Sequence, residues 1–340
     1  MIPDKARNKQ LNGGAPDNWN FVKPTISRMD CDRQDMPLIY AIVSSWHDGD
    51  IIYDTVRNCF NNGCEKVFLL DNNSPDDSVS EAVRAGAEIA EIYDTEYYDD
   101  DLRIRKQNDF MRTVVEKYQH RELWFLALDG DEFPTGHGAD TIQQTLGRLP
   151  GEIRTIGSKG IDLYPQKNER HTIGQHPASC FSYGINRIAR FACDLYHWKH
   201  VALRYFNGIF DVAQTRGNHR PSARHTHRPL YEPATLSLPI FHAPMRNEEN
   251  ARARLTTLCG KKNEQGNHRS VGDDQVIDGQ GAIKRFHSLD MIYSQQWDKV
   301  ELPHSQMYGR HITGICPYPW RILCPGLEYE QTYRLPILQE

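Results

Sequence analysis

Short apolar runs alternate with amphipathic segments between residues 38 and 128, and this alternation constrains the fold more than any other feature of the chain. The apolar runs are rich in β-forming residues and predict strands over 38–43, 66–70, 88–93 and 123–128. Apolar residues at helical spacing occupy the intervals 50–62, 74–85 and 102–118. Strands that alternate with helices in this way predict an α/β domain with a mostly parallel sheet and helices on both faces.

Glycine and capping residues mark the expected helix boundaries. Gly63 supplies a stop for the first helix. Ser74 suits an N-cap, Pro75 suits the first helical position, and Asp77 falls where a capping box needs an acid. We therefore expect the second helix to begin at Ser74 and to run to about residue 85.

Acidic residues follow two of the expected strands. Asp71 comes directly after 66–70, and Asp129 comes directly after 123–128. In sheets of this class, ligands bind beyond the carboxyl ends of the strands. We therefore expect Asp71 and Asp129 to lie on one edge of the sheet, although they are far apart in sequence.

The pattern beyond residue 134 is less regular, and it suggests a division of the chain. Strands are expected over 151–160, 186–192, 201–206 and 236–241, with a helix over 247–258. We expect a polar N-terminal arm over 1–36 and one domain over 37–262, with a donor half (about 37–135) and an acceptor half (about 136–262). We expect residues 263–340 to form an irregular C-terminal extension packed on that domain.

Charge and hydropathy exclude several classes of protein. The chain has 340 residues and a formal net charge of −5, which argues against nucleic acid as a partner. No apolar run approaches the ~20 residues that span a bilayer, and the first residues lack the apolar stretch of a secretory signal. We expect a cytoplasmic protein without a transmembrane segment. Peripheral membrane attachment is left open, since no basic amphipathic helix demands it.

The motif with the clearest chemistry is the segment LALDGDEF, residues 126–133. It places Asp129, Asp131 and Glu132 directly after a buried strand. Carboxylates spaced by one residue in a turn can face one hard cation such as Mn²⁺ or Mg²⁺. The alternative is an acidic turn that is merely solvated.

Taken together, the segments between residues 42 and 133 resemble glycosyltransferase family two, of the GT-A fold with its Rossmann-like sheet. More narrowly, they resemble the branch whose metal motif is Asp-x-Asp-Glu-Phe. The matching pieces include SSWHD (44–48), NGC (62–64), LDNNSPD (70–76), RKQN (105–108), residues 124–133, GNH (217–219) and FHAPMR (241–246). The branch usually has Asn-Glu after the first strand, where this chain has His47 and Asp48.

The resemblance implies transfer of a sugar from a nucleotide-sugar donor to an acceptor hydroxyl. Most members of the family invert the anomeric centre, and by family habit the donor is a UDP-sugar. It also implies a Mn²⁺ or Mg²⁺ cofactor held by Asp129 and Asp131, with His242 as a further ligand. Asp71 would meet the nucleobase. The acceptor would be a glycan, a lipid-linked saccharide or a small molecule.

Other residues are assigned to the donor side. Trp46 and His47 either flank the nucleotide or pack beneath the next helix. Gln107 and Gly130 lie in matching segments, and Arg246 would neutralise the leaving diphosphate. Alternatively, Asp71 caps the helix that follows it. The alternative for His242 is a structural hydrogen bond to a neighbouring loop.

The general base is the least determined assignment. Asp211 is the nominal choice because it follows an apolar segment and precedes the Gly-Asn-His motif. His219 is the second, since imidazole accepts protons near neutral pH, although a structural histidine is an equal alternative. Asp162 and Asp194 are next in line.

Two other functions compete with sugar transfer. An aspartate-nucleophile phosphatase also has a strand that ends in Asp-x-Asp, but it usually has Thr or Val where this chain has Phe133. A non-catalytic carbohydrate-binding protein of the same fold is the third hypothesis. The presence of Asp129, Asp131 and His242 together argues against a degenerate site.

Overall fold

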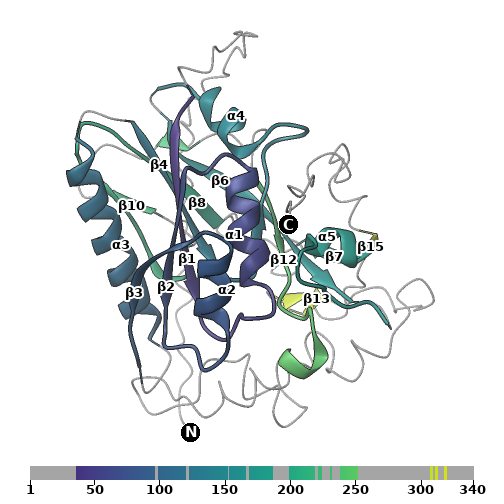
Figure 1. Cartoon of the computed structure of the whole chain (residues 1–340). Helices are drawn as coiled ribbons and strands as arrows, with labels where there is room; N and C mark the ends of the chain where they lie inside the picture. Colours follow the sequence, from purple (N-terminus) through teal and green to yellow (C-terminus); the bar gives the residue numbers. More distant parts are fainter. Residues whose placement is uncertain are drawn as a thin grey trace, which may run out of the picture.

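The computed structural model describes residues 36–95, 99–119, 122–151, 153–165, 168–186, 199–218, 221–223, 230–231 and 238–251, with the short pieces 307–308, 311–312 and 318–319. In these residues the main feature is an 11-stranded sheet with helices packed against it (Figure 1). The expected α/β class is therefore confirmed. None of the described helices has the length and apolarity that a membrane span requires.

The first half of the sheet is parallel. Its elements are β1 (Leu38–Ser45), α1 (Ile52–Asn61), β2 (Lys66–Asp71), α2 (Ser78–Arg84), β3 (Glu88–Ile92), α3 (Asp100–Lys117) and β4 (Leu123–Asp129). β1 lies between β2 and β4 and is parallel to both, and β3 is parallel to β2. Helical connections carry the chain back between parallel strands, as the alternation in the sequence predicted.

The second half is mixed. It contains β5 (Glu132–Pro134), α4 (Ile142–Gly147), β6 (Ile153–Tyr164), α5 (Pro177–Cys180), β7 (Tyr183–Asn186), β8 (Lys199–Tyr205), β9 (Val212–Gln214), the 3₁₀ turn η2 (Arg216–Asn218), β10 (Pro221–Ala223), β11 (Leu230–Tyr231), β12 (Leu238–His242), β13 (Met307–Tyr308), β14 (His311–Ile312) and β15 (Tyr318–Pro319). β8 is antiparallel to both β4 and β6, whereas β12 is parallel to β6. β15 is antiparallel to β7, so part of the C-terminal extension joins the sheet.

Alternating residues of the strands build a core on each face of the sheet. In β1, Ile39 and Val43 pack with residues of α1 and α2, whereas Tyr40 and Ile42 pack with residues of α3. This division follows the two-residue period of a strand, which sends successive side chains to opposite faces. Helices therefore cover both faces, as expected (Figure 1). A third apolar cluster, which includes Phe133, joins β5 to β6 and β12.

The start of the second helix differs from the expectation. α2 begins at Ser78 with Asp77 at the N-cap position, not at Ser74. The Ser74 hydroxyl instead donates to Asp71 (2.6 Å) and accepts from the backbone N–H of His47 (3.0 Å). A serine engaged by neighbouring loops cannot also cap a helix, so four more residues remain in the loop.

Other expectations are confirmed or fall outside the described residues. The strands expected over 151–160, 201–206 and 236–241 correspond to β6, β8 and β12. Most of the strand expected over 186–192, most of the helix expected over 247–258 and nearly all of the arm over 1–36 lie outside the described residues.

Candidate active site

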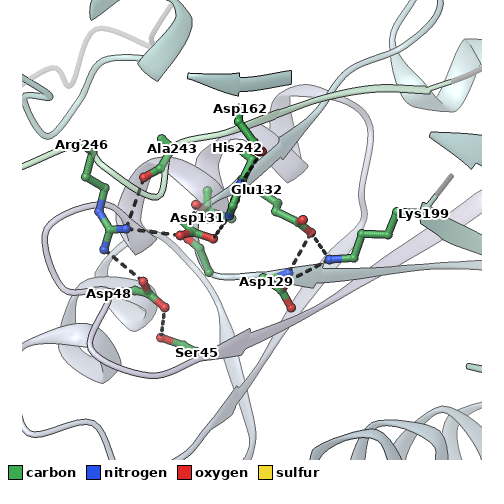
Figure 2. A network of polar contacts seen from close by, with 12 residues as sticks. Ser45, Asp48, Asp129, Asp131, Glu132, Asp162, Lys199, His242, Ala243 and Arg246 are labelled. Atoms are coloured by element: carbon green, nitrogen blue, oxygen red, sulfur yellow. Dashed lines mark hydrogen bonds and ion pairs between the residues drawn. The ribbon is translucent and has the colours of Figure 1, made fainter. Parts of the chain in front are cut away.

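Segments far apart in sequence meet at the carboxyl end of β4. Asp129 ends that strand, Asp131 lies in the turn that follows, and His242 ends β12. β12 is antiparallel to β5, with His242 opposite Glu132, and the backbone N–H of Ala243 donates to the carbonyl of Asp131 (3.1 Å). Figure 2 shows these side chains gathered around the acidic turn. The sequence pattern predicted this convergence of Asp129, Asp131 and His242 at one edge.

His242 lies between two carboxylates. Its Nδ1 is 2.8 Å from Oδ1 of Asp162, and its Nε2 is 3.4 Å from Oδ1 of Asp131 (Figure 2). The parallel pairing of β12 with β6 places Asp162 directly beside His242. Asp162 is fully buried and Asp131 is nearly so. The strand register therefore determines which ring nitrogen faces which carboxylate.

Asp131 and His242 fit a divalent cation. Two ligands at about 2.1 Å from one cation, at 90–109° to each other, lie roughly 3.0–3.4 Å apart, and the Nε2–Oδ1 distance of 3.4 Å is close to this range. Among the described residues, no three His, Cys, Asp or Glu side chains surround a common point as a complete metal site would.

Asp129 has cationic partners in place of a metal. Its carboxylate is 2.8 Å from Nζ of Lys199 and 3.1 Å from Nη1 of Arg103. Lost hydration raises the pKa of Asp129, but Lys199 and Arg103 more than offset that and hold the pKa well below its usual range. Lys199 also contacts the buried Glu132 at 2.6 Å. The metal role expected for Asp129 thus stays a prediction, which would require these contacts to rearrange.

Sequence reasoning missed Arg103 and Lys199. Arg103 is buried and donates to Asp100 in the first turn of α3. Lys199 starts β8, two residues before the start expected from the apolar pattern. The only indication that Lys199 lies beside Asp129 is that β8 is next to β4 in the sheet. No local sequence motif reveals this adjacency.

Arg246 is enclosed by acids. Its guanidinium lies 2.7 Å from Asp50, 3.0 Å from Asp48 and 3.4 Å from Asp131. Burial lowers the pKa of Arg246, but the three carboxylates outweigh burial and raise it. The guanidinium of Arg246 therefore connects the loop that follows β1 to the acidic turn. This differs from the expected contact with a diphosphate, which stays a prediction.

Asp71 shapes the loop after β2. It is fully buried, and it accepts hydrogen bonds from the backbone N–H (2.7 Å) and the hydroxyl (2.6 Å) of Ser74. Burial raises the pKa of Asp71, with the two Ser74 bonds opposing. Both of its oxygens accept from Ser74 within the loop, so Asp71 does not cap α2, whose N-cap position is occupied by Asp77, and the nucleobase contact stays a prediction.

The other donor-side residues are distributed around the same edge. Trp46 and His47 are partly exposed, with ring centroids 5.7 Å apart, and thus retain surface that a ligand can reach. Gln107 is fully buried and donates to Asn218 (2.9 Å), which connects α3 to η2. The carbonyl of Gly130 accepts from the Thr55 hydroxyl (2.6 Å). Gln107 and Gly130 therefore have packing roles in the structure.

The structure places Asp211, the nominal general base, away from the acidic turn, and its catalytic role stays a prediction. Tyr205 at the end of β8 pairs with Leu123 at the start of β4, so the segment after β8 begins at the opposite edge of the sheet from Asp129. There Asp211 forms a two-point ion pair with Arg154, with one contact of 3.0 Å. Of the other candidates, Asp162 binds His242, and His219 and Asp194 lie outside the described residues.

Comparisons with known proteins give only distant structural neighbours. No protein-family model matches the chain, and no curated protein matches it in sequence. A glucosyl-3-phosphoglycerate synthase from Mycobacterium tuberculosis, crystallised with Mn²⁺, UDP and glucosyl-3-phosphoglycerate, is 12% identical with a TM-score of 0.24, over 36% of this chain and 44% of that chain. A mannosyl-3-phosphoglycerate synthase from Rubrobacter xylanophilus is 14% identical with a TM-score of 0.24, over 42% and 44%.

These similarities are low. The chain covers less than half the length of each of these structures. TM-scores of 0.24 are below the level at which a likeness carries a functional argument.

Proposed function

We propose that the protein is a glycosyltransferase that moves a sugar from a nucleotide-diphosphate donor to an acceptor hydroxyl, with Mn²⁺ or Mg²⁺ as cofactor. The observation that carries the proposal is the approach of His242 Nε2 to Asp131 Oδ1 at 3.4 Å, directly beside Asp129. Two ligand atoms aimed at one place, at the sheet edge where α/β proteins bind their ligands, suit a cation with a bound diphosphate. The family resemblance of the motifs adds the nucleotide-sugar donor, with UDP favoured and inversion expected.

Each group of side chains has a separate task in this proposal. Asp131 and His242 hold the cation, which when bound would stabilise the negative charge of the leaving diphosphate. Lys199 and Arg103 bring two positive charges to Asp129, whose side chain is 40% exposed. Arg246 keeps the β1 loop and the acidic turn in place through Asp48 and Asp131.

The acceptor side is less defined. The proposal places His219 as the general base, since it follows η2, whose Gly217 N–H donates to Asp100 (2.8 Å) in the same turn of α3 that carries Arg103. Loss of a general base typically lowers the rate by about 10²–10⁴. The acceptor is a glycan, a lipid-linked saccharide or a small molecule with a free hydroxyl.

The test is a thermal-shift experiment followed by a transfer assay. UDP and Mn²⁺ together should stabilise the protein by about 2.7 kcal/mol at one hundred times the dissociation constant, whereas either alone should do less. A panel of nucleotide sugars should then identify a donor whose hydrolysis requires the metal. Asp131→Asn and His242→Ala should each shift the Mn²⁺ requirement to higher concentration.

The assay also separates the competing functions. Release of phosphate from p-nitrophenyl phosphate, without stabilisation by UDP, would favour the aspartate-nucleophile phosphatase. Stabilisation by an oligosaccharide alone, without nucleotide or metal, would favour the carbohydrate-binding protein. Either result would overturn the proposal.

A further inference from the structure

The buried carboxylate of Asp162 faces the ring nitrogen of His242 that points away from the acidic turn. Asp162 is fully buried in β6, and its Oδ1 lies 2.8 Å from Nδ1 of His242. The pairing of β6 with β12 sets these residues side by side, so backbone hydrogen bonds maintain the contact. Burial of a carboxylate is costly unless it has a good partner. This arrangement therefore needs an explanation in terms of what Asp162 does for His242.

The contact determines which nitrogen carries the proton. A carboxylate accepts hydrogen bonds, so Nδ1 of His242 donates to Asp162 and carries hydrogen. In the neutral ring, the lone pair is then on Nε2. That atom lies 3.4 Å from Oδ1 of Asp131. A lone pair that faces a carboxylate oxygen across this distance is repulsive, and either a second proton on Nε2 or a cation between the two atoms relieves that repulsion.

We propose that Asp162 is a positioning residue, which fixes Nε2 of His242 as the ligand atom for a divalent cation shared with Asp131. This inference rests on the proposed function, because it assumes that the site holds a metal. A carboxylate on the distal nitrogen of a metal-binding histidine fixes the tautomer and the ring orientation and raises ligand basicity. Asp162, initially a candidate general base, is thereby assigned a different role.

The two ends of the histidine are also held by different elements. Asp162 belongs to β6, and the Asp131 turn is bound to β12 through the Ala243 N–H to Asp131 carbonyl bond of 3.1 Å. His242 thus bridges two separately held carboxylates, with Nε2 directed to the acidic turn (Figure 2). A histidine that served packing alone would not need a buried acid on the side distant from the turn.

The test measures Mn²⁺ affinity by calorimetry in the full chain, in the presence of UDP. Asp162→Leu removes the acceptor and should weaken Mn²⁺ binding by about 10–100-fold, the usual effect of losing such a partner. Asp162→Asn retains a neutral acceptor of the same shape and should give a smaller loss. Asp109→Asn, the same substitution at an exposed position that pairs with Arg112, is the matched control and should leave Mn²⁺ affinity unchanged.

A double-mutant cycle and a spectroscopic measurement separate positioning from simple destabilisation. If Asp162 acts through His242, adding Asp162→Asn to His242→Ala should weaken Mn²⁺ binding no further. In metal-free protein, ¹⁵N spectra of the histidine rings, assigned with His242→Ala, should show the Nδ1–H form in the parent and a shifted equilibrium in Asp162→Leu. The spectra give a result even if the variants melt at lower temperature.

The possible failures are distinguishable. Parental Mn²⁺ affinity in Asp162→Leu would overturn the positioning role and leave the proposed function intact. A metal-free parent whose neutral His242 ring carries its hydrogen on Nε2 and not on Nδ1 would overturn the positioning role as well. A parent that binds no Mn²⁺ with UDP would instead overturn the metal dependence of the proposed function.

Discussion

Gly130, in the acidic turn, has little space around its α-carbon. A Cβ atom added there would lie 2.4 Å from Oδ2 of Asp48 and 2.9 Å from its Cγ. Asp48 cannot easily move, because Arg246 holds it at 3.0 Å and the backbone N–H of Trp46 donates to it at 3.2 Å. The glycine is thus required by close packing, which the sequence motif alone did not reveal.

We expect Gly130→Ala to lower the free energy of unfolding by about 1–3 kcal/mol, the usual cost of overpacking. Urea denaturation measures this directly. Gly151→Ala is the control, because an added Cβ at Gly151 meets nothing within 4 Å. Equal effects of the two substitutions would contradict the packing argument.

Lys199 is the second residue whose role depends on its neighbours. Its side chain is 5% exposed, and its ammonium lies 2.6 Å from the fully buried Glu132. Lys199→Met removes the positive charge and leaves the acid in place, which should cost about 3–5 kcal/mol in stability. Chemical denaturation provides the measurement.

The control for Lys199 is an exposed pair. Lys66→Met removes an ion pair with Glu88 in which both side chains are about one-third exposed or more, and it should cost about 1 kcal/mol or less. The double variant Lys199→Met/Glu132→Gln should recover much of the loss, because the uncompensated charge is gone. A loss that persists undiminished would show that packing, not charge, explains the effect.

At the scale of elements, the loop between β2 and α2 depends on one hydrogen-bonded unit. Asp71 binds Ser74 twice, and the Ser74 hydroxyl also accepts from His47, so the unit connects the loops after β1 and β2. Asp71→Ala and Ser74→Ala should each cost about 1–3 kcal/mol, with a coupling of about 0.5–3 kcal/mol in the double variant.

The same variants test how Asp71 affects the donor. If Asp71 acts through the loop, both substitutions should weaken the binding of UDP and Mn²⁺ to a similar extent in calorimetry. A loss confined to Asp71→Ala, with parental affinity in Ser74→Ala, would instead favour the direct nucleobase contact that the family resemblance implies.

The elements themselves differ in how well the sequence predicts them. β1, β2, β4 and α3 have strong apolar patterns and end within two residues of where those patterns end, so their positions could be predicted. The start of α2 could not, because the Ser74 side chain bonds Asp71 and the His47 N–H instead of capping the helix, and those contacts exist only in the folded loop. Local pattern therefore predicts elements better than it predicts their boundaries.

The site shows the same limit. Asp129, Asp131 and His242 could be placed at one edge because each follows or ends a recognisable strand. The pairings of His242 with Asp162 and of Asp129 with Lys199 could not, because they depend on the order and register of β4, β6, β8 and β12. No residue near Asp162 in sequence indicates that a histidine lies beside it.

At the scale of the whole molecule, the acidic turn and Asp211 lie at opposite ends of the sheet's strands. β4 is seven residues long, which is roughly 20 Å at about 3.3 Å per residue. Asp129 ends this strand, whereas Asp211 lies near its start, in an ion pair with Arg154 that is partly exposed. Substitutions at the two ends should therefore affect different properties.

We expect Asp211→Asn to lower the free energy of unfolding by about 1 kcal/mol, the upper range for a partly exposed pair, and to leave Mn²⁺ and UDP affinity at the parental value. His242→Ala should instead weaken Mn²⁺ binding, and it should also lower stability because the buried Asp162 loses this contact. The measurements are urea denaturation and calorimetry on both variants, followed by a transfer assay once a donor is known.

The two substitutions should act independently because Asp211 and His242 lie far apart, and residues more than about 7–10 Å apart without shared partners behave independently. A loss of transfer in Asp211→Asn at full stability would return Asp211 to the list of catalytic candidates, and the segment after β8 would then have to reach the opposite edge during the reaction.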